Sequence, residues 1–115
     1  MVTLFLAKAL ICFSGTCYPA LVGSNTLPGE YPLHQRYVLS EGYGGDVLQY
    51  RETDDMVYAI HRVWTLKPEQ RRRERLQSDS PAMRRNVTNG CINVTEEVYV
   101  KLLDCCSNGT LVIKE

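Results

Sequence analysis

Short apolar runs separated by turn residues are the feature of this sequence that most restricts its fold. Each run is bounded by glycine, proline, serine or aspartate, residues that favour turns and interrupt regular structure. Runs of this length and spacing are typical of strands, so the pattern predicts a β-rich core. The predicted extended segments are residues 2–12, 18–22, 31–39, 46–50, 56–63 and 110–114, and residues 85–93 are expected to return as strand and turn.

Two segments have the composition of helices. Pro68 is suited to the first turn of a helix, and residues 69–78 are rich in Arg, Glu and Gln, which are good helix formers. This helix is nearly all polar, so we expect it on the surface. Thr95 is a candidate N-cap for a second helix. The apolar face of that helix would contain Val98, Leu102 and Cys105, which are spaced i, i+4 and i+7.

The length of 115 residues fits one domain, and a formal net charge of zero argues against a nucleic-acid-binding protein. The charge is nevertheless uneven, because residues 67–85 hold seven of the thirteen Lys and Arg residues and only three acids. This excess describes either a solvated helix face or a basic lid over an acidic substrate. We expect residues 67–80 to form a helical insertion or lid.

Five cysteines leave one thiol unpaired if the other four form bridges. Cys12 and Cys17 flank a turn over residues 13–16 and could bridge across a hairpin. Cys105 and Cys106 are neighbours, and we expect two free thiols there because a bond between adjacent residues is strained. None of the cysteines has the spacing of a zinc site, so neither a metal nor a cofactor is expected.

The N-terminal apolar run does not have the pattern of a targeting segment. No basic residue precedes it, and Lys8 interrupts it after residues 2–7. The run is too short for the core of a signal peptide and far too short to span a bilayer. We therefore read it as a strand and expect neither an export signal nor membrane insertion.

Cys91 is the cysteine whose surroundings best suit a nucleophile. It follows Gly90, which allows a ligand to approach the backbone closely, and polar side chains surround it at Thr88, Asn89 and Asn93. It also precedes the second predicted helix by a few residues, where the helix dipole would lower a thiol pKa. The alternative is a structural cysteine in a glycine-containing turn.

A cysteine nucleophile needs a base, and the chain has two histidines. His34 lies among polar and charged residues, whereas His61 follows the apolar part of a predicted strand. A side chain on a strand is held more rigidly than one on a loop, so His61 is the better candidate. The alternative is a buried histidine that only fills the core.

The segment around Cys91, together with the upstream histidine, resembles the signature of the L,D-transpeptidase catalytic domain. That family has a histidine after a hydrophobic strand, and later Ser/Thr-His-Gly-Cys, an apolar residue, and Asn or Arg. The matching residues are His61, Thr88, Gly90, Cys91, Ile92 and Asn93. Residues 22–31 resemble the family's glycine and Thr-Pro-x-Gly-x-aromatic hairpin, and residues 106–113 resemble its closing Gly-Thr-x-Val strand. The resemblance covers nearly the whole chain.

Two departures from the family pattern affect the interpretation. Asn89 occupies the position of the family's histidine before Gly-Cys, and an amide can donate a hydrogen bond but cannot titrate. In addition, 26 residues separate His61 from Thr88, more than the family commonly has. The excess corresponds to the Arg-rich segment, which we interpret as an insertion beside the cleft.

The resemblance implies one catalytic domain over residues 1–115, mainly β with α: a β-rich sandwich of mixed sheets with an Arg-rich surface helix and a helix after Cys91. It implies that Cys91 attacks the third-residue carbonyl of a peptidoglycan stem tetrapeptide, expels the terminal D-alanine and leaves a thioester. His61 would be the base, oriented by the backbone carbonyl of Arg62. The N–H groups of Gly90 and Cys91 would stabilise the oxyanion.

The implied partners are a tetrapeptide donor and an amine acceptor, and the implied compartment is the periplasm or cell wall of a bacterium. We expect a monomer. The candidate substrate-binding residues are Asn89, Thr88, Asn93, Arg85, Arg84 and Trp64. Two other functions stay open: an L,D-carboxypeptidase or D-amino-acid exchange toxin using the same site, and a non-catalytic cell-wall-binding module in which Cys91 is structural.

Overall fold

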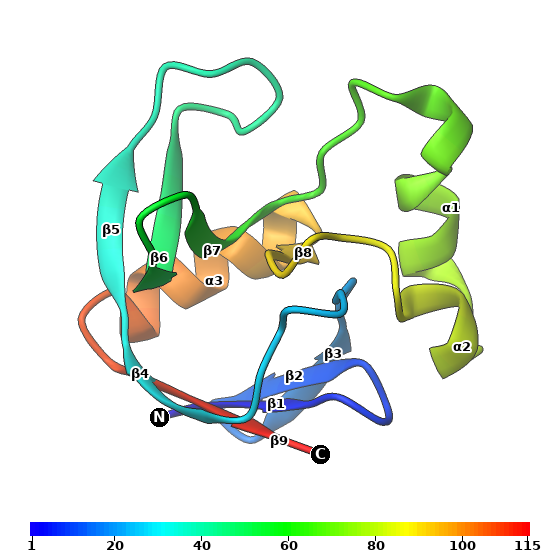
Figure 1. The fold of residues 1–115 in the computed structure, drawn as a ribbon. Helices are drawn as coiled ribbons and strands as arrows, with labels where there is room; N and C mark the ends of the chain where they lie inside the picture. Colours follow the sequence, from blue (N-terminus) through cyan, green and yellow to red (C-terminus); the bar gives the residue numbers. More distant parts are fainter.

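The computed structural model describes residues 1–115 as two β-sheets accompanied by four short helices (Figure 1). The first sheet contains β1 (Val2–Phe5), β2 (Leu10–Phe13), β3 (Thr16–Pro19), β4 (Gly29–Pro32) and β9 (Thr110–Lys114). The second contains β5 (His34–Tyr37), β6 (Asp46–Glu52), β7 (Val57–Arg62) and β8 (Ile92–Val94). The helices are η1 (Pro68–Gln70), α1 (Arg72–Gln77), α2 (Pro81–Arg84) and α3 (Glu96–Cys106).

Both sheets mix parallel and antiparallel pairs, as the fold-class prediction required. The first sheet has the order β3-β2-β1-β9-β4, in which only β1 and β9 run parallel. The second has the order β5-β6-β7-β8, in which only β7 and β8 run parallel. A parallel pair needs a long crossover, and the crossover between β7 and β8 contains η1, α1 and α2.

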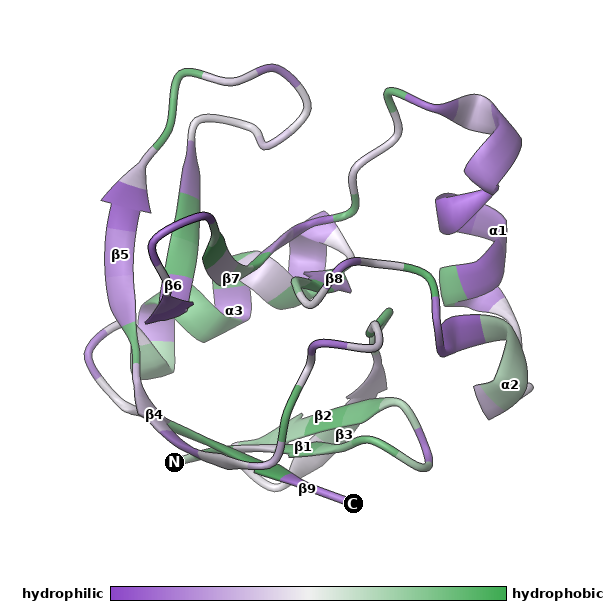
Figure 2. Ribbon diagram, in the orientation of Figure 1, coloured by the Kyte–Doolittle hydropathy of each residue, from purple (hydrophilic) through white to green (hydrophobic).

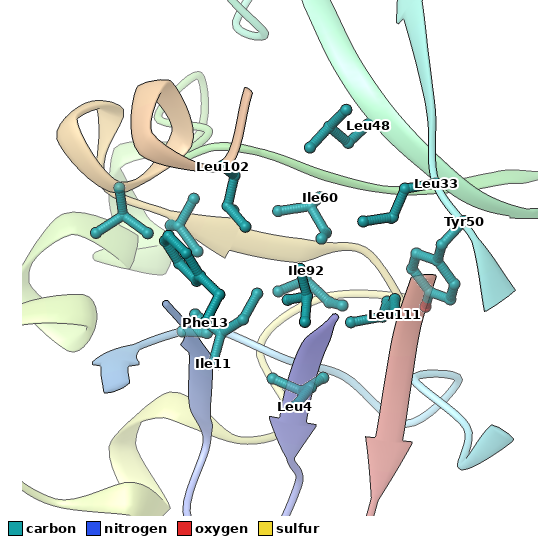
Figure 3. Packing of buried hydrophobic residues seen from close by; sticks show 14 of the residues in the cluster. Leu4, Ile11, Phe13, Leu33, Leu48, Tyr50, Ile60, Ile92, Leu102 and Leu111 are labelled. Atoms are coloured by element: carbon teal, nitrogen blue, oxygen red, sulfur yellow. The ribbon is translucent and has the colours of Figure 1, made fainter. Parts of the chain in front are cut away.

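One hydrophobic core joins the sheets and α3. Figure 3 shows Leu4 and Ile11 of the first sheet facing Ile60 and Ile92 of the second, with Leu102 of α3 beside them. All five side chains are fully buried. Burial of one such side chain contributes about 1.5–3 kcal/mol, so this layer fixes how the sheets lie against each other. Figure 2 shows the contrast with α1, which is hydrophilic along most of its length and lies outside the layers.

The prediction of one strand over residues 2–12 was wrong. The chain turns between β1 and β2, so that Thr3 pairs antiparallel with Cys12. Ala9 has a φ of 50° in this turn, a conformation that gives no signal in the sequence because alanine rarely adopts it. Lys8, which interrupts the apolar run, is exposed within the turn.

The prediction of one helix over residues 69–78 was also wrong in detail. Arg71 has left-handed backbone angles, which separate η1 from α1. Pro81 lies beyond the end of α1 and begins the further short helix α2, which was not predicted. Leu76 is the buried residue of α1, as expected for a surface helix.

The second predicted helix and the closing strand are confirmed, but the predicted apolar face was wrong at one position, since Cys106 is buried with Val98 and Leu102 and Cys105 is exposed. The Thr95 side chain accepts a hydrogen bond from the N–H of Val98 at 3.2 Å and caps α3. The strand β9 begins and ends where the sequence predicted it. None of the helices combines the length and the apolar character required to span a bilayer.

Candidate active site

The parallel pairing of β7 with β8 sets the position of the candidate site. His61 of β7 pairs with Asn93 of β8, and Cys91 directly precedes β8. As a result, His61 and Cys91 both line two cavities, one of about 150 Å³ and one of about 210 Å³. Tyr43 also lines both cavities, and its ring meets the imidazole edge-on with centroids 4.7 Å apart. The structure therefore brings the two principal candidates together from segments 30 residues apart in the chain.

The imidazole of His61 is held by hydrogen bonds at both nitrogens. Nδ1 lies 2.6 Å from the backbone carbonyl oxygen of Arg62, and because a carbonyl only accepts, Nδ1 must carry the proton. Nε2 is then the unprotonated nitrogen and faces the side-chain amide of Asn93 at 3.4 Å. The other end of that amide, Oδ1, accepts from the N–H of Trp64 and from Arg72, each at 3.1 Å, which fixes its orientation.

Burial keeps His61 neutral. Its side chain is only 1% exposed, and desolvation is the main reason that its pKa is lowered from 6.5 to about 4. The nearby Arg72 cation lowers it further, while the bond to the Arg62 carbonyl acts in the opposite direction. At neutral pH this histidine can accept a proton at Nε2, as a general base must.

Cys91 is a half-buried thiol whose pKa is raised, chiefly by desolvation. The backbone N–H of Ala59 and the Arg72 cation favour the thiolate but do not overcome burial. Sγ lies 3.8 Å from the carbonyl oxygen of Val57, to which a thiol can donate. The expected lowering of this pKa by the following helix was wrong, because β8 separates Cys91 from α3 and burial dominates.

Four hydrogen bonds shape the turn before Cys91. The Thr88 hydroxyl accepts from the N–H of Gly90 at 3.1 Å and donates to the carbonyl of Cys91 at 2.6 Å. The carbonyl of Gly90 accepts from the hydroxyls of Thr26 and Tyr50 at 2.9 and 2.6 Å. The N–H of Gly90, expected to point at an oxyanion, is thus occupied within the turn. The N–H of Cys91 takes part in none of these bonds.

Glycine is required at position 90 for two reasons. Its φ is 147°, which side chains rarely adopt, and an added Cβ would lie 2.4 Å from the ring of Tyr58. Gly23 is similarly restricted, because a Cβ there would lie 1.8 Å from the carbonyl oxygen of Thr88. The two glycines quoted for the resemblance therefore allow the strand-like segment near Gly23 to pack directly against the turn.

Some of the other predicted site residues line the cavity beside Cys91, and others do not. Asn89, Thr88 and Trp64 line the larger cavity beside Cys91. Asn93 is fully buried and contacts the site only through its side-chain bonds to His61 and its neighbours. The Arg62 guanidinium points away, forming an ion pair with Asp46 at 2.8 Å.

The arginines at 84 and 85 do not reach the cavity, contrary to the sequence prediction. Arg84 is 4% exposed, and its guanidinium donates to the backbone carbonyls of Lys8, Ala9 and Ser78. It therefore ties α2 to the β1–β2 turn. Arg85 is exposed and lines neither cavity.

Sequence reasoning missed four residues of the site. Thr26 was quoted only as part of a flanking motif, and Tyr50 and Tyr43 carried no signal. Tyr50 lies at an irregularity between the β6–β7 pairs, which turns it towards Gly90. Arg72 was one of several arginines in a basic run, and only the tertiary structure separates it from the others.

The cysteine pairing leaves Cys91 as the free thiol. Cys12 and Cys17 form a disulfide between paired strands, one of the pairings the sequence left open. Cys105 and Cys106 also form a disulfide, so the expectation of two free thiols there was wrong. No group of three or more His, Cys, Asp or Glu side chains gathers as a metal site.

Comparison with solved structures identifies the fold. The chain superposes on the L,D-transpeptidase from Mycobacterium smegmatis with a TM-score of 0.63 and 17% identity, covering 99% of this chain and 58% of that one. For an L,D-transpeptidase from Xylanimonas cellulosilytica the TM-score is 0.60 at 15% identity, covering 98% of this chain and 59% of that one. No protein-family model and no curated protein matches the sequence.

These likenesses show that the chain has the L,D-transpeptidase-like fold, as the resemblance predicted. The chain spans less than two thirds of the length of each of the two solved structures.

The buried neutral His61 should make stability depend on pH. Because its pKa is about 4 in the folded chain and 6.5 unfolded, the unfolded chain takes up the proton first as pH falls. The contribution of the neutral His61 to the free energy of unfolding is complete above pH 6.5. As the pH falls from 6.5 to 4, the free energy of unfolding decreases by about 3 kcal/mol. Urea unfolding of the wild type and of His61→Gln at several pH values should show this slope only in the wild type. His34→Gln should retain it, and an unchanged slope in His61→Gln would contradict the assignment.

Gly90→Ala should destabilise the fold and distort the cavity, because the methyl group meets Tyr58 and the backbone is strained. Gly45→Ala is the matched control, since its φ is 104° but nothing lies within 4 Å of the added Cβ. Thermal melts should show a larger loss for Gly90→Ala, by about 1–3 kcal/mol. Equal losses of stability in the two variants would mean that the contact with Tyr58 does not contribute to the destabilisation.

Proposed function

We propose that the chain is a cysteine acyltransferase of the L,D-transpeptidase type that acts on peptidoglycan stem peptides. The observation that carries this proposal is the free thiol of Cys91 lining the same cavities as His61, whose Nδ1 is bound to the Arg62 carbonyl. The fold supports it, because the likenesses at 15–17% identity are to proteins described as L,D-transpeptidases.

In the first half-reaction, Sγ of Cys91 attacks the carbonyl of the third residue of a tetrapeptide while His61 Nε2 takes the thiol proton. Both groups are neutral at rest, so the proton moves as the carbon–sulfur bond forms. Nε2 must give up its contact with the Asn93 amide, which at 3.4 Å is long for a hydrogen bond. The reaction therefore has to break only a weak hydrogen bond at Nε2.

The negative charge then develops on the former carbonyl oxygen. We assign its stabilisation to the N–H of Cys91, since the N–H of Gly90 is occupied by Thr88. The exposed amide of Asn89 lines the cavity and supplies a second donor, where the family has a histidine. This preference for Cys91 and Asn89 over Gly90 follows from the hydrogen bonds of the turn.

The tetrahedral intermediate collapses when the His61 imidazolium gives its proton to the leaving amine of D-alanine. The carbon–nitrogen bond breaks and the acyl group remains on Cys91 as a thioester. An amine acceptor then attacks, His61 removes its proton, and the thiolate leaves with that proton. The product is a cross-linked peptide; water as acceptor would give an L,D-carboxypeptidase, and a free D-amino acid would give exchange.

This proposal places the protein where peptidoglycan is found, in the periplasm or cell wall.

One observation favours a second candidate, a non-catalytic cell-wall-binding module. Burial raises the pKa of Cys91 and lowers that of His61, and both shifts disfavour a preformed thiolate–imidazolium pair. Asn89 also lacks the titratable group of the family's histidine. In this module Cys91 would be a structural residue of the turn.

Turnover distinguishes the acyltransferase from the module. Incubation with disaccharide-tetrapeptide should yield products whose masses show loss of D-alanine, with or without gain of an acceptor. Cys91→Ala should abolish these products, and His61→Gln should slow them by about 10²–10⁴-fold. His34→Gln is the control and should retain full activity. Products formed by folded Cys91→Ala would require another nucleophile.

Thiol reactivity provides an independent check. A thiol-directed probe or a carbapenem should add once to the folded protein, at Cys91, because the other four cysteines are paired. Peptide mapping by mass spectrometry locates the adduct. Failure of Cys91 to react in folded protein, with reaction on unfolding, would favour the binding module.

A further inference from the structure

Arg72 is a partly buried cation without a carboxylate partner. Its guanidinium donates from Nη1 to Asn93 Oδ1 at 3.1 Å and from Nε to Gln70 Oε1 at 2.8 Å, and lies 5.0 Å from the centroid of the Trp64 ring. These partners are all neutral, and none of the four ion pairs in the chain includes Arg72. Its pKa is lowered, mainly by burial, so the charge is held at a cost that no anion offsets.

The cavity beside Cys91 is positively charged. Arg72 and Lys67 both line it, and none of its other lining residues is acidic. Those other residues are Tyr43, Met56, His61, Trp64, Gln70, Thr88, Asn89 and Cys91.

The positive surface continues outward from this cavity. A neighbouring cavity of about 260 Å³ is lined by the same Lys67 and Arg72, together with Arg71 and Arg73. Its one acid, Glu74, is paired with Arg71 at 2.5 Å and so adds little free negative charge. Figure 2 shows the hydrophilic character of α1, on which Arg72 and Arg73 lie. A basic path therefore leads from the surface to the thiol.

We propose that Arg72 and Lys67 form an anion-binding subsite. This subsite holds a carboxylate of the peptide while the carbonyl to be attacked lies at Cys91. This inference rests on the proposed function, since it names the class of peptide that the site selects. The planar guanidinium can bind a carboxylate with two parallel hydrogen bonds, and its Nη2 makes no hydrogen bond in this structure. Lys67, which lines the same cavity, adds a point charge.

The same guanidinium also bears on the base. Arg72 bonds to Asn93 Oδ1, and the amide end of Asn93 faces His61 Nε2. A carboxylate that takes hydrogen bonds from Arg72 would weaken the bond between Arg72 and Asn93 Oδ1. It would thereby also weaken the contact between the Asn93 amide and His61 Nε2. Arg72 is therefore a specificity-determining residue that also bonds the amide facing His61.

Binding to a variant that cannot react tests this subsite separately from catalysis. In Cys91→Ala, calorimetry is carried out with the free-acid tetrapeptide and with the same peptide carrying one carboxylate at a time as a primary amide. Amidation of one particular carboxylate should weaken binding about tenfold or more. Adding Arg72→Gln should weaken the free-acid peptide by a similar factor and leave the amide unchanged, so that the preference disappears.

Arg85→Gln in the Cys91→Ala background is the matched control, because Arg85 is exposed and lies outside the cavity. It should keep the full preference, and Arg72→Lys should keep part of it. Thermal melts establish that each variant is folded. If Arg72→Gln does not fold, Arg72→Lys tests the proposal instead, by a reduced preference for the free-acid peptide over the amide. An undiminished preference in either Arg72 variant, or no binding of the free-acid peptide to Cys91→Ala, would overturn the proposal. Arg72-dependent binding without any turnover by the wild type would leave the subsite standing and reject the acyltransferase.

Discussion

The parallel pairing of β7 with β8 is the constraint on which the rest of the site depends. It sets Ile60 opposite Ile92 in the core and His61 opposite Asn93 at the cavity. Because side chains alternate along a strand, a shift of one residue would turn both pairs over, taking the isoleucines out of the hydrophobic core and His61 away from the cavity. Core packing therefore holds the register, and the register holds the imidazole near Cys91.

The residues around Cys91 and His61 determine the chemistry of the site as much as these two side chains do. Two hydroxyls hold the Gly90 carbonyl, one hydroxyl holds its N–H, and the Arg62 carbonyl determines which nitrogen of His61 is protonated. Burial then keeps both the thiol and the imidazole neutral. In the proposed acyl transfer, proton transfer and attack must therefore occur together, and the proposed binding of an anionic substrate by Arg72 fits that requirement.

The sequence allowed much of the fold and part of the site to be predicted. Strand-forming runs, the Thr95 cap and the closing strand follow local rules, and the resemblance indicated the fold that the solved structures confirm. The turn at Ala9 could not be predicted, because tertiary pairing forces a conformation that alanine disfavours. The arginines show the same limit: Arg84 and Arg72 look alike in sequence, yet one is bonded to backbone carbonyls and the other faces the thiol.

The protonation state and tautomer of His61 test the central claim most directly. Nitrogen NMR of ¹⁵N-histidine-labelled protein, titrated from neutral to acid pH and assigned by comparison with His61→Gln, reports which ring nitrogen carries the proton. The structure predicts a neutral ring protonated at Nδ1, with a pKa of about 4. A ring protonated at Nε2 would show that Nε2 is not available to Cys91 as a base, and one that titrates near 6.5 as an exposed histidine does would contradict the burial of the ring.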